Sequence, residues 1–468
     1  MKKKLIITLA VLIVSIVIFQ PLLAMGSGES GPQSSAAAAG GQAKYVFLFV
    51  GDGMAPTQVS ATEYYLATRE NNMNFDINRL RFTQFPSAGL MNTHDYGSLI
   101  TDSASAGTAF ATGRKTLSSM INVDPRDGRT PYKTIAQYAQ EAGMRIGIVS
   151  NVTLTHATPA AFYGSVNHRN NTDGNDNEPR GLAQQLVESG FDYFAGGWIV
   201  SNSANNDRWV NEARRLGYTV TNTRAGFNSL NANSGKVIAF AERIQDSGSM
   251  HYEIDRLSTD LSLADFTRKG IELLNNPNGF FMMVESGKID WAGTAGLPAQ
   301  PGVSANLGMG YSMYLDRIDQ QTRSFVAFNA DVVNPYRARV TDSSQRRLED
   351  LYPAILESFG IDLRPASLNI SEYQRNQIDI AFRRSMDQPV DAPQEGWSVF
   401  HSGYEPLTIK LTHVMNQTAG IGWTSYSHTA TPVLNFAMGV HHDFFNGYYD
   451  NTEIFFMLAR AMGINVGF

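Results

Sequence analysis

Short, continuous runs of apolar residues alternate along the chain with longer segments of helical periodicity. The runs at 45–50, 144–150 and 280–284 are β-prone and lead into glycine-containing or polar loops, and segment 132–143 is an amphipathic helix ended by glycine. Helices that alternate with fully apolar strands predict a mostly parallel sheet covered by helices on both faces. The chain is therefore expected to be an α/β protein.

In such sheets, ligands bind beyond the carboxyl ends of the strands. This rule selects Asp52, the segment 150–158, Glu285 and Asp290. An aspartate between glycines, as in Gly-Asp52-Gly, is also an ordinary turn residue. Two acids at the exit of one buried strand are costly to leave unpaired, and a divalent cation is one way to pair them.

Composition restricts the function classes. The 468 residues are 43% apolar and 17% charged, with a net charge of -6. Mild acidity argues against a nucleic-acid-binding protein that neutralises phosphates over a broad surface. It leaves room for a small phosphate-ester substrate held locally by an arginine or a metal ion. The length allows one large α/β domain or two to three smaller ones.

The N-terminus has the layout of an export signal. Three lysines precede an apolar run from Leu5 to Phe19, and small residues follow near Ala24. We expect a signal peptide at 1–26 and a flexible, Gly/Ser/Ala-rich linker at 27–43. The alternative is an uncleaved anchor, which is the one route by which we expect a membrane contact. The chain has no cysteine, so disulfides and a lipoprotein linkage are excluded, and a periplasmic or secreted location is expected.

The segment Thr-Asp-Ser-Ala-Ser-Ala-Gly-Thr-Ala (101–109) has two interpretations. In the structural one, Thr101 or Asp102 caps a helix whose small residues pack closely against the sheet. In the functional one, Ser103 lies in the first helical turn, where backbone N–H groups and the helix dipole favour negative charge. No histidine is adjacent to activate this serine, so a metal ion is the natural activator.

Two further residues have similarly divided interpretations. Arg169 is either a solvated or ion-paired residue, or a fork that grips phosphate through two parallel hydrogen bonds. His428, among small hydroxyl residues ahead of a strand-like run, is either structural or a metal ligand.

The order of these motifs is more specific than any one of them. Asp-Gly-Met (52–54), Thr-Asp-Ser-Ala-x-Ala-Gly-Thr-Ala, Ala-Thr-Pro-Ala (157–160), Val-Glu-x-Gly-x-Ile-Asp-Trp-Ala (284–292) and Trp-Thr-x-x-x-His-Thr (423–429) follow one another. This series resembles the alkaline phosphatase family, from about Lys44 to the end and most weakly across 293–415. The resemblance implies a three-layer α/β sandwich with a mostly parallel central sheet flanked by helices. It also implies a phosphomonoesterase that uses two Zn²⁺ ions and one Mg²⁺ ion, and family members commonly form homodimers.

By the same resemblance, Ser103 is the nucleophile that becomes phosphoserine, and Arg169 clamps the nonbridging phosphate oxygens. The implied metal ligands are Asp52, bridging a zinc and the magnesium; Thr158 and Glu285, on the magnesium; and Asp290 and His428, on the other zinc. His156 and Trp291 occupy positions near the magnesium that vary within the family.

Two zinc-ligand histidines of the family pattern are replaced. Thr294 stands four residues after Asp290, where a histidine is expected. A strand over 325–328 is expected to end near Asp331, which keeps a zinc-ligand carboxylate, whereas Val332 replaces the following histidine. The magnesium site, the nucleophile and the arginine are intact by this comparison.

Three interpretations of the altered zinc sites follow. The metals are held through water or substitute ligands such as His401 or His413, or the sites favour Mg²⁺ or Mn²⁺, or the protein is a noncatalytic relative that binds phosphate or a partner. A working phosphomonoesterase, with attenuated turnover, is the main prediction. We further expect a helical insertion at about 335–415 and a loop at 293–313.

Overall fold

The computed structural model describes residues 41–71, 77–294, 314–365, 367, 370–390, 404–422 and 427–467. The expected signal peptide, the linker up to residue 40, most of the expected loop 293–313, and His401 lie outside these ranges. Within them, no helix is both long enough and apolar enough to cross a membrane. Ala43, which the sequence assigned to the linker, is part of the folded body, because its N–H donates to the Ala461 carbonyl at 2.8 Å.

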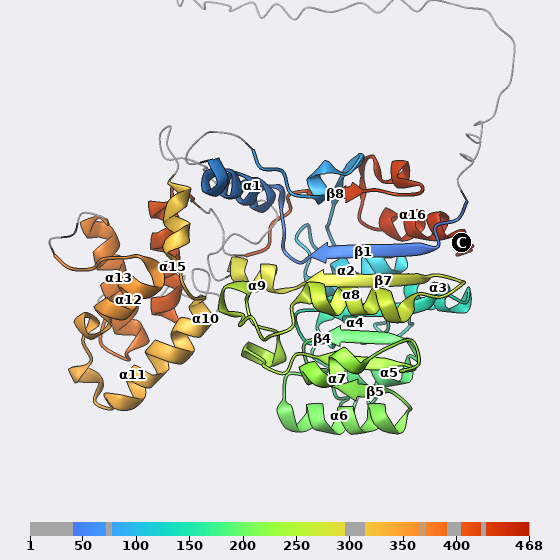
Figure 1. The fold of residues 1–468 in the computed structure, drawn as a ribbon, viewed down its shortest axis with the longest axis horizontal. Coiled ribbons are helices and arrows are strands. Elements are labelled where there is room, and N and C mark those ends of the chain that lie inside the picture. The colour runs from blue at the N-terminus through green and yellow to red at the C-terminus, as the bar shows by residue number, and fades with distance from the viewer. Residues whose placement is uncertain are drawn as a thin grey trace, which may run out of the picture. The chain divides into compact units, whose positions relative to one another are not determined.

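The central sheet is parallel throughout the described residues. Six strands are hydrogen-bonded in the order β1-β7-β3-β4-β6-β5. They span β1 Tyr45–Gly51, β3 Arg145–Ser150, β4 Tyr193–Gly196, β5 Thr219–Thr221, β6 Val237–Phe240 and β7 Phe280–Ser286. The expected strands at 45–50, 144–150 and 280–284 are thereby confirmed, and they are the three neighbours at the β1 edge of the sheet (Figure 1).

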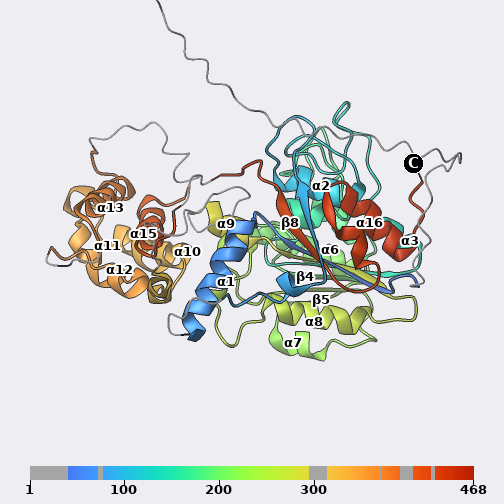
Figure 2. The same ribbon diagram turned by 90° about the horizontal axis from the view of Figure 1, so that it is seen from above.

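Alternate side chains of the strands enter two different cores. On β7, Phe281 and Met283 pack in one buried cluster, whereas Phe280, Met282 and Val284 pack in another. The first cluster includes residues of helices α2, α3, α5, α6 and α16, and the second includes residues of α7 and α8. Figure 2 shows α7 and α8 on the opposite side of the sheet from α2 and α16. The three-layer α/β sandwich is therefore confirmed.

The helices of this body begin and end as follows: α1 Pro56–Asn71, α2 Ser103–Thr112, α3 Ile135–Glu141, α4 Ala157–Ala160, α5 Leu182–Glu188, α6 Ser203–Arg215, α7 Arg224–Ser229, α8 Leu263–Leu274, α9 Lys288–Thr294 and α16 Glu453–Met462. A second, three-stranded sheet has the order β8-β2-β9, with β2 Ser87–Asn92, β8 Val433–Ala437 and β9 Gly447–Asp450. His428 precedes β8, so the strand-like run after this histidine is confirmed as a strand, but in the smaller sheet.

The helical insertion begins earlier in the chain than expected. Its described helices start with a 3-10 helix at Leu315–Gln320 and continue with α10 Phe325–Phe328, α11 Asn334–Arg339, α12 Tyr352–Phe359, α13 Glu372–Ser385 and α15 Pro406–Thr418. Helices α10, α11, α12, α13 and α15 share a buried cluster of their own, which includes Phe328, Ile355, Phe382 and Leu411. We call this part, from Leu315 to Thr418, the helical subregion (Figure 1).

The expected strand over 325–328 is wrong. These residues form α10, and a π-helical turn follows at Asn329–Val333. Ser324 caps α10, its Oγ accepting the Ala327 N–H at 3.1 Å, and Phe325 and Phe328 are both buried against neighbouring helices. A run of four apolar residues is too short for its periodicity to distinguish a strand from a buried helix. Here the Ser324 cap and the packing of Phe325 and Phe328 against other helices favour the helix.

Gly107 sets the distance between α2 and α4. A Cβ at this position would lie 2.9 Å from the Ala161 Cβ and 3.5 Å from the Thr158 Cα. We expect Gly107→Ala to lower the free energy of unfolding by about 1–3 kcal/mol, since the two helices must separate to accept the methyl group. Urea unfolding checks this, and an unchanged midpoint would show that the contact is looser than the structure has it.

Candidate active site

Three neighbouring strands bring polar side chains to the carboxyl-terminal end of the central sheet. In the register of the sheet, Glu285 on β7 lies opposite Val50 on one side and Ser150 on the other. Asp52 follows the end of β1 directly. Asp52, Ser150 and Glu285 thus lie at the carboxyl ends of these strands, as the sequence predicts, whereas Asp290 lies on α9, the helix that follows β7.

Ser103 is the first residue of α2. Asp102 caps this helix: its Oδ1 accepts the Ser105 N–H at 3.0 Å, and the Ser105 side chain accepts the Asp102 N–H at 3.3 Å. This reciprocal cap holds the first turn in place. The Ser103 hydroxyl donates to Asp52 Oδ2 at 3.0 Å, and the serine is 6% exposed. Ser103 therefore lies at the N-terminus of a helix and faces the carboxyl end of β1.

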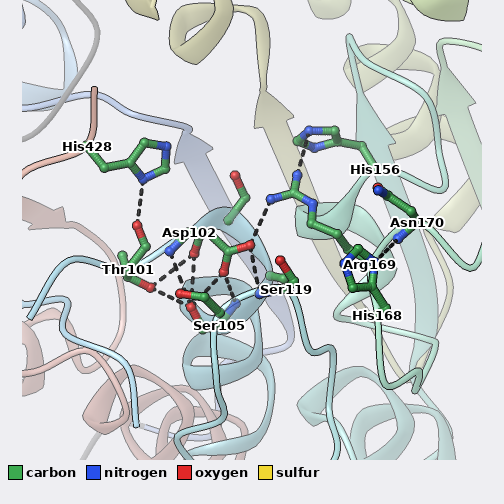
Figure 3. A network of polar contacts seen from close by, with 12 residues as sticks. Thr101, Asp102, Ser105, Ser119, His156, His168, Arg169, Asn170 and His428 are labelled. Carbon is green, nitrogen blue, oxygen red and sulfur yellow. Dashed lines mark hydrogen bonds and ion pairs between the residues drawn. The ribbon is translucent and has the colours of Figure 1, made fainter. Parts of the chain in front are cut away.

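Arg169 lies beside the same helix start, as Figure 3 shows. Its Nη1 donates to Asp102 Oδ2 at 3.0 Å, and its Nη2 is 3.1 Å from His156 Nε2. Burial alone would raise the pKa of Asp102, but the Arg169 charge and the Ser105 N–H outweigh it and hold that pKa below its usual value. Asp102 thus stays ionised and orients the guanidinium.

His156 is a neutral imidazole in this setting. Its burial, followed by the Arg169 charge, lowers the pKa of His156 to about 3. Its Nδ1 lies 3.8 Å from Glu285 Oε1. Because the guanidinium can only donate, Nε2 accepts from Arg169, and the neutral ring carries its proton on Nδ1, which faces Glu285.

Asp52, His156 and Glu285 form a group whose ligand atoms all lie within 4.8 Å of one another. Burial, and then the Asp52 charge, raises the pKa of Glu285 to about 8, and burial also raises the pKa of Asp52. Among the described residues, His156 Nδ1, Thr158 Oγ1 and Glu285 Oε1 are buried without a hydrogen-bond partner. Unpaired buried polar atoms are costly, and a divalent cation would satisfy the oxygens of Thr158 and Glu285 together. The group fits a cation that accepts mainly oxygen ligands.

Asp290 and His428 form a separate pair. Asp290 Oδ1 lies 3.7 Å from His428 Nε2. The opposite ring nitrogen, Nδ1, lies 2.6 Å from the Thr101 carbonyl, which can only accept, so Nδ1 carries the proton (Figure 3). In the neutral ring Nε2 therefore keeps its lone pair and faces Asp290, a common arrangement of a metal-binding histidine.

The structure does not bring Asp331 to either group. Asp331 is exposed on the π-helical turn of the helical subregion, and it is not at a strand end because residues 325–328 are helical. The adjacent Val332 packs against the core of that subregion, and His413 is buried on α15. Thr294 is the last residue of α9. The described residues contain one group of three potential metal-binding side chains, and it does not include Asp290 or His428.

Two supporting residues were missed from the sequence. Asp102 was interpreted only as a cap, although its second carboxylate oxygen holds Arg169. Ser150 donates its hydroxyl to Glu285 Oε2. A carboxylate that caps a helix with one oxygen has a second oxygen free to bind a cationic side chain. The position of Asp102 immediately before the candidate nucleophile could therefore have indicated this second role. The strand-end rule selects Ser150 within the segment 150–158, but nothing in the local sequence indicates its hydrogen bond to Glu285.

Comparisons with known proteins show the family and the fold. The family model "Alkaline phosphatase" matches residues 43–301, more than half of the chain. The chain is 26% identical to alkaline phosphatase 3 of Bacillus subtilis over 98% of its own length and 97% of that protein. Its fold is similar to the crystal structure of a cold-active alkaline phosphatase from a Shewanella species, with a TM-score of 0.69, 22% identity, and 89% and 99% of the two chains covered. A histidine-to-aspartate mutant of TAB5 alkaline phosphatase, solved with Mg bound in its M3 site, matches with a TM-score of 0.52, 21% identity, and 91% and 99% coverage.

Proposed function

The chain belongs to the alkaline phosphatase family, and we propose that it is an exported, metal-dependent phosphomonoesterase that forms a phosphoserine on Ser103. The observation that carries this proposal is the position of Ser103. It begins a helix, its hydroxyl faces Asp52, and Arg169 is held next to it by Asp102. Nucleophile, phosphate-binding fork and carboxylates thus surround one point at the edge of the sheet.

Each residue has a distinct role in the proposed reaction. Ser103 Oγ attacks the phosphorus, the bond to the leaving oxygen breaks, and water later cleaves the Ser103 phosphoester to release inorganic phosphate. Arg169 binds nonbridging oxygens, and the N-terminus of α2 favours the negative charge of the phosphoryl group. Asp102 keeps the guanidinium oriented through its ion pair. Preorganisation of this kind is the main contribution a protein makes to phosphoryl transfer.

Metal ions complete the proposed site. Asp52, Thr158 and Glu285 would hold Mg²⁺ with His156 beside them, and Asp290 and His428 would hold Zn²⁺ or another divalent cation. When bound, such cations lower the pKa of a serine hydroxyl and stabilise charge that develops on the leaving oxygen. The unpartnered buried oxygens of Thr158 and Glu285 support this assignment.

A noncatalytic, phosphate-binding relative is the second candidate. It is favoured by Thr294, which stands where the resemblance to the family implies a histidine, and by Asp331, which lies on an exposed helical turn instead of the expected strand end. Loss of imidazole ligands weakens zinc binding, because even changes behind the ligands cost about 10–100-fold in affinity.

Hydrolysis of p-nitrophenyl phosphate separates the two candidates. The chelator-treated protein is assayed at pH 7 to 10 with Zn²⁺, Mg²⁺, Mn²⁺ or Co²⁺ added separately, and acid-quenched samples are searched for phosphoserine by mass spectrometry. We expect metal-dependent turnover and a phosphate on Ser103. Folded protein that binds inorganic phosphate but turns over with none of these metals would establish the noncatalytic relative. Cell fractionation tests the periplasmic or secreted location.

A further inference from the structure

Lys288 is a buried cation at the first position of α9. It is 3% exposed, and its ammonium donates to Gln245 Oε1 at 2.8 Å, to Asp246 Oδ1 at 2.9 Å and to the Met250 carbonyl at 2.9 Å. The Tyr252 ring covers it, with the centroid 3.7 Å from Nζ. All three N–H donors of the ammonium are therefore used, and an aromatic face shields the charge from water.

These partners all come from one loop, residues 245–252, which the side chain ties to the start of α9. The Lys288 backbone is fixed as well, since its N–H donates to Asn151 Oδ1 at 3.2 Å, just after β3. The Lys288 ammonium is buried and fully bonded, whereas Asp246 is only partly buried, so loss of the carboxylate would leave the buried ammonium uncompensated. The start of α9 is thus held from two sides.

The helix that Lys288 anchors carries groups of the candidate site. Asp290, two residues later, faces His428 at 3.7 Å. The Trp291 ring packs edge-on against His156, with centroids 6.1 Å apart, and lies 5.6 Å from Lys288 Nζ. Rotation or fraying of this short helix would therefore move both the Asp290 carboxylate and the wall beside His156.

We propose that Lys288 is a positioning residue that holds Asp290 in the orientation needed to bind a divalent cation together with His428. This inference rests on the proposed function. Lys288 itself touches no reacting atom. Lys288 acts by orienting α9. Its substitution should therefore lower the affinity for metal, and turnover should fall only as a result of that loss.

The test compares Lys288→Met with Lys288→Arg and a matched control, Lys269→Met. Lys269 on α8 has similar surroundings, with the Leu230 carbonyl at 3.1 Å, Glu272 at 2.7 Å and the Phe227 ring centroid at 5.8 Å. Each full-length variant is titrated with Zn²⁺ alone and with Mg²⁺ alone, following both p-nitrophenyl phosphate hydrolysis and the metal-induced rise in Tm.

For Lys288→Met we expect the half-saturating metal concentration to rise about 10-fold or more. We also expect kcat at saturating metal to return to within about 3-fold of the parent, with KM unchanged. Lys288→Arg keeps the charge and should recover most of the affinity, and Lys269→Met should bind metal like the parent. Unchanged metal affinity in Lys288→Met, or activity that saturating metal fails to restore, would overturn the proposal.

Failure of the proposed function gives a different pattern. A parent that takes up metal, shown by its Tm, but hydrolyses no ester with any metal refutes the phosphomonoesterase, while the Tm titration still decides the role of Lys288. A parent that takes up no metal contradicts both proposals.

Discussion

Ser103→Ala is expected to lower kcat for p-nitrophenyl phosphate by on the order of 10³-fold or more, since it removes the hydroxyl proposed as the nucleophile. The substitution removes one buried hydroxyl, which donates to Asp52 Oδ2 at 3.0 Å, and it leaves the helix cap at Asp102 intact. The fold and the binding of inorganic phosphate at Arg169 should therefore persist, and phosphoserine should no longer be detected.

Ser105→Ala is the matched control for Ser103→Ala. Ser105 is also buried, on the same turn of α2, but its hydroxyl belongs to the cap. We expect it to cost about 1 kcal/mol of unfolding free energy and to leave kcat within about 10-fold of the parent. Steady-state kinetics and urea unfolding of both variants give the answer. Comparable kcat losses in the two variants would assign the effect to helix distortion rather than to a nucleophile.

The second large effect is expected at Glu285, in the protein stripped of metal. Burial and the Asp52 charge raise the pKa of Glu285 from 4.5 to about 8 in the folded state. Between these values the folded protein binds more protons than the unfolded chain, so the free energy of unfolding falls as pH rises. The contribution of Glu285 is fully present below about pH 4.5 and is lost by about pH 8, at about 1.4 kcal/mol per pH unit at most.

Glu285→Gln removes this titrating carboxyl but keeps an oxygen that can accept from Ser150. We therefore expect the metal-free variant to be more stable than the metal-free parent above pH 8, and the difference to vanish near pH 4.5. With Mg²⁺ added the order should reverse, because only the parent gains binding energy, about 2.7 kcal/mol at 100 times Kd. Urea unfolding over this pH range, with EDTA or Mg²⁺, measures both effects. A parent that is more stable than the variant at pH 8 in EDTA would mean that the buried carboxylate has a partner other than a metal.

The sequence predicted those parts of the site whose position depends on a strong local pattern. Asp52 and Glu285 follow continuous apolar runs, and Ser103 follows a capping residue. The rule that ligands bind beyond the carboxyl ends of parallel strands was therefore enough to predict that the two carboxylates lie close together. Their convergence depends on strand order, which is set by pairing between distant segments, yet every order that keeps these strands parallel brings their carboxyl ends to the same side of the sheet.

The prediction failed where the local pattern was short. The run 325–328 suits a strand or a buried helix equally well, and the choice between them came from Ser324 and from partners on α12, α13 and α15. Because residues 325–328 are helical, Asp331 is not at a strand end, where the sequence predicted it. The roles of Ser150 and Lys288 were invisible for another reason, because each depends on a contact with a residue far away in the sequence.

The position of β7 between β1 and β3 has a consequence for biosynthesis. Synthesis proceeds from the N-terminus, so β1 and β3, with Asp52 and Ser150 at their ends, are complete long before β7 exists. They are not hydrogen-bonded to each other, and the strand that joins them is the last of the sheet to leave the ribosome. The side chains at the ends of β1 and β3 are therefore joined to Glu285 only after more than half of the chain has been made.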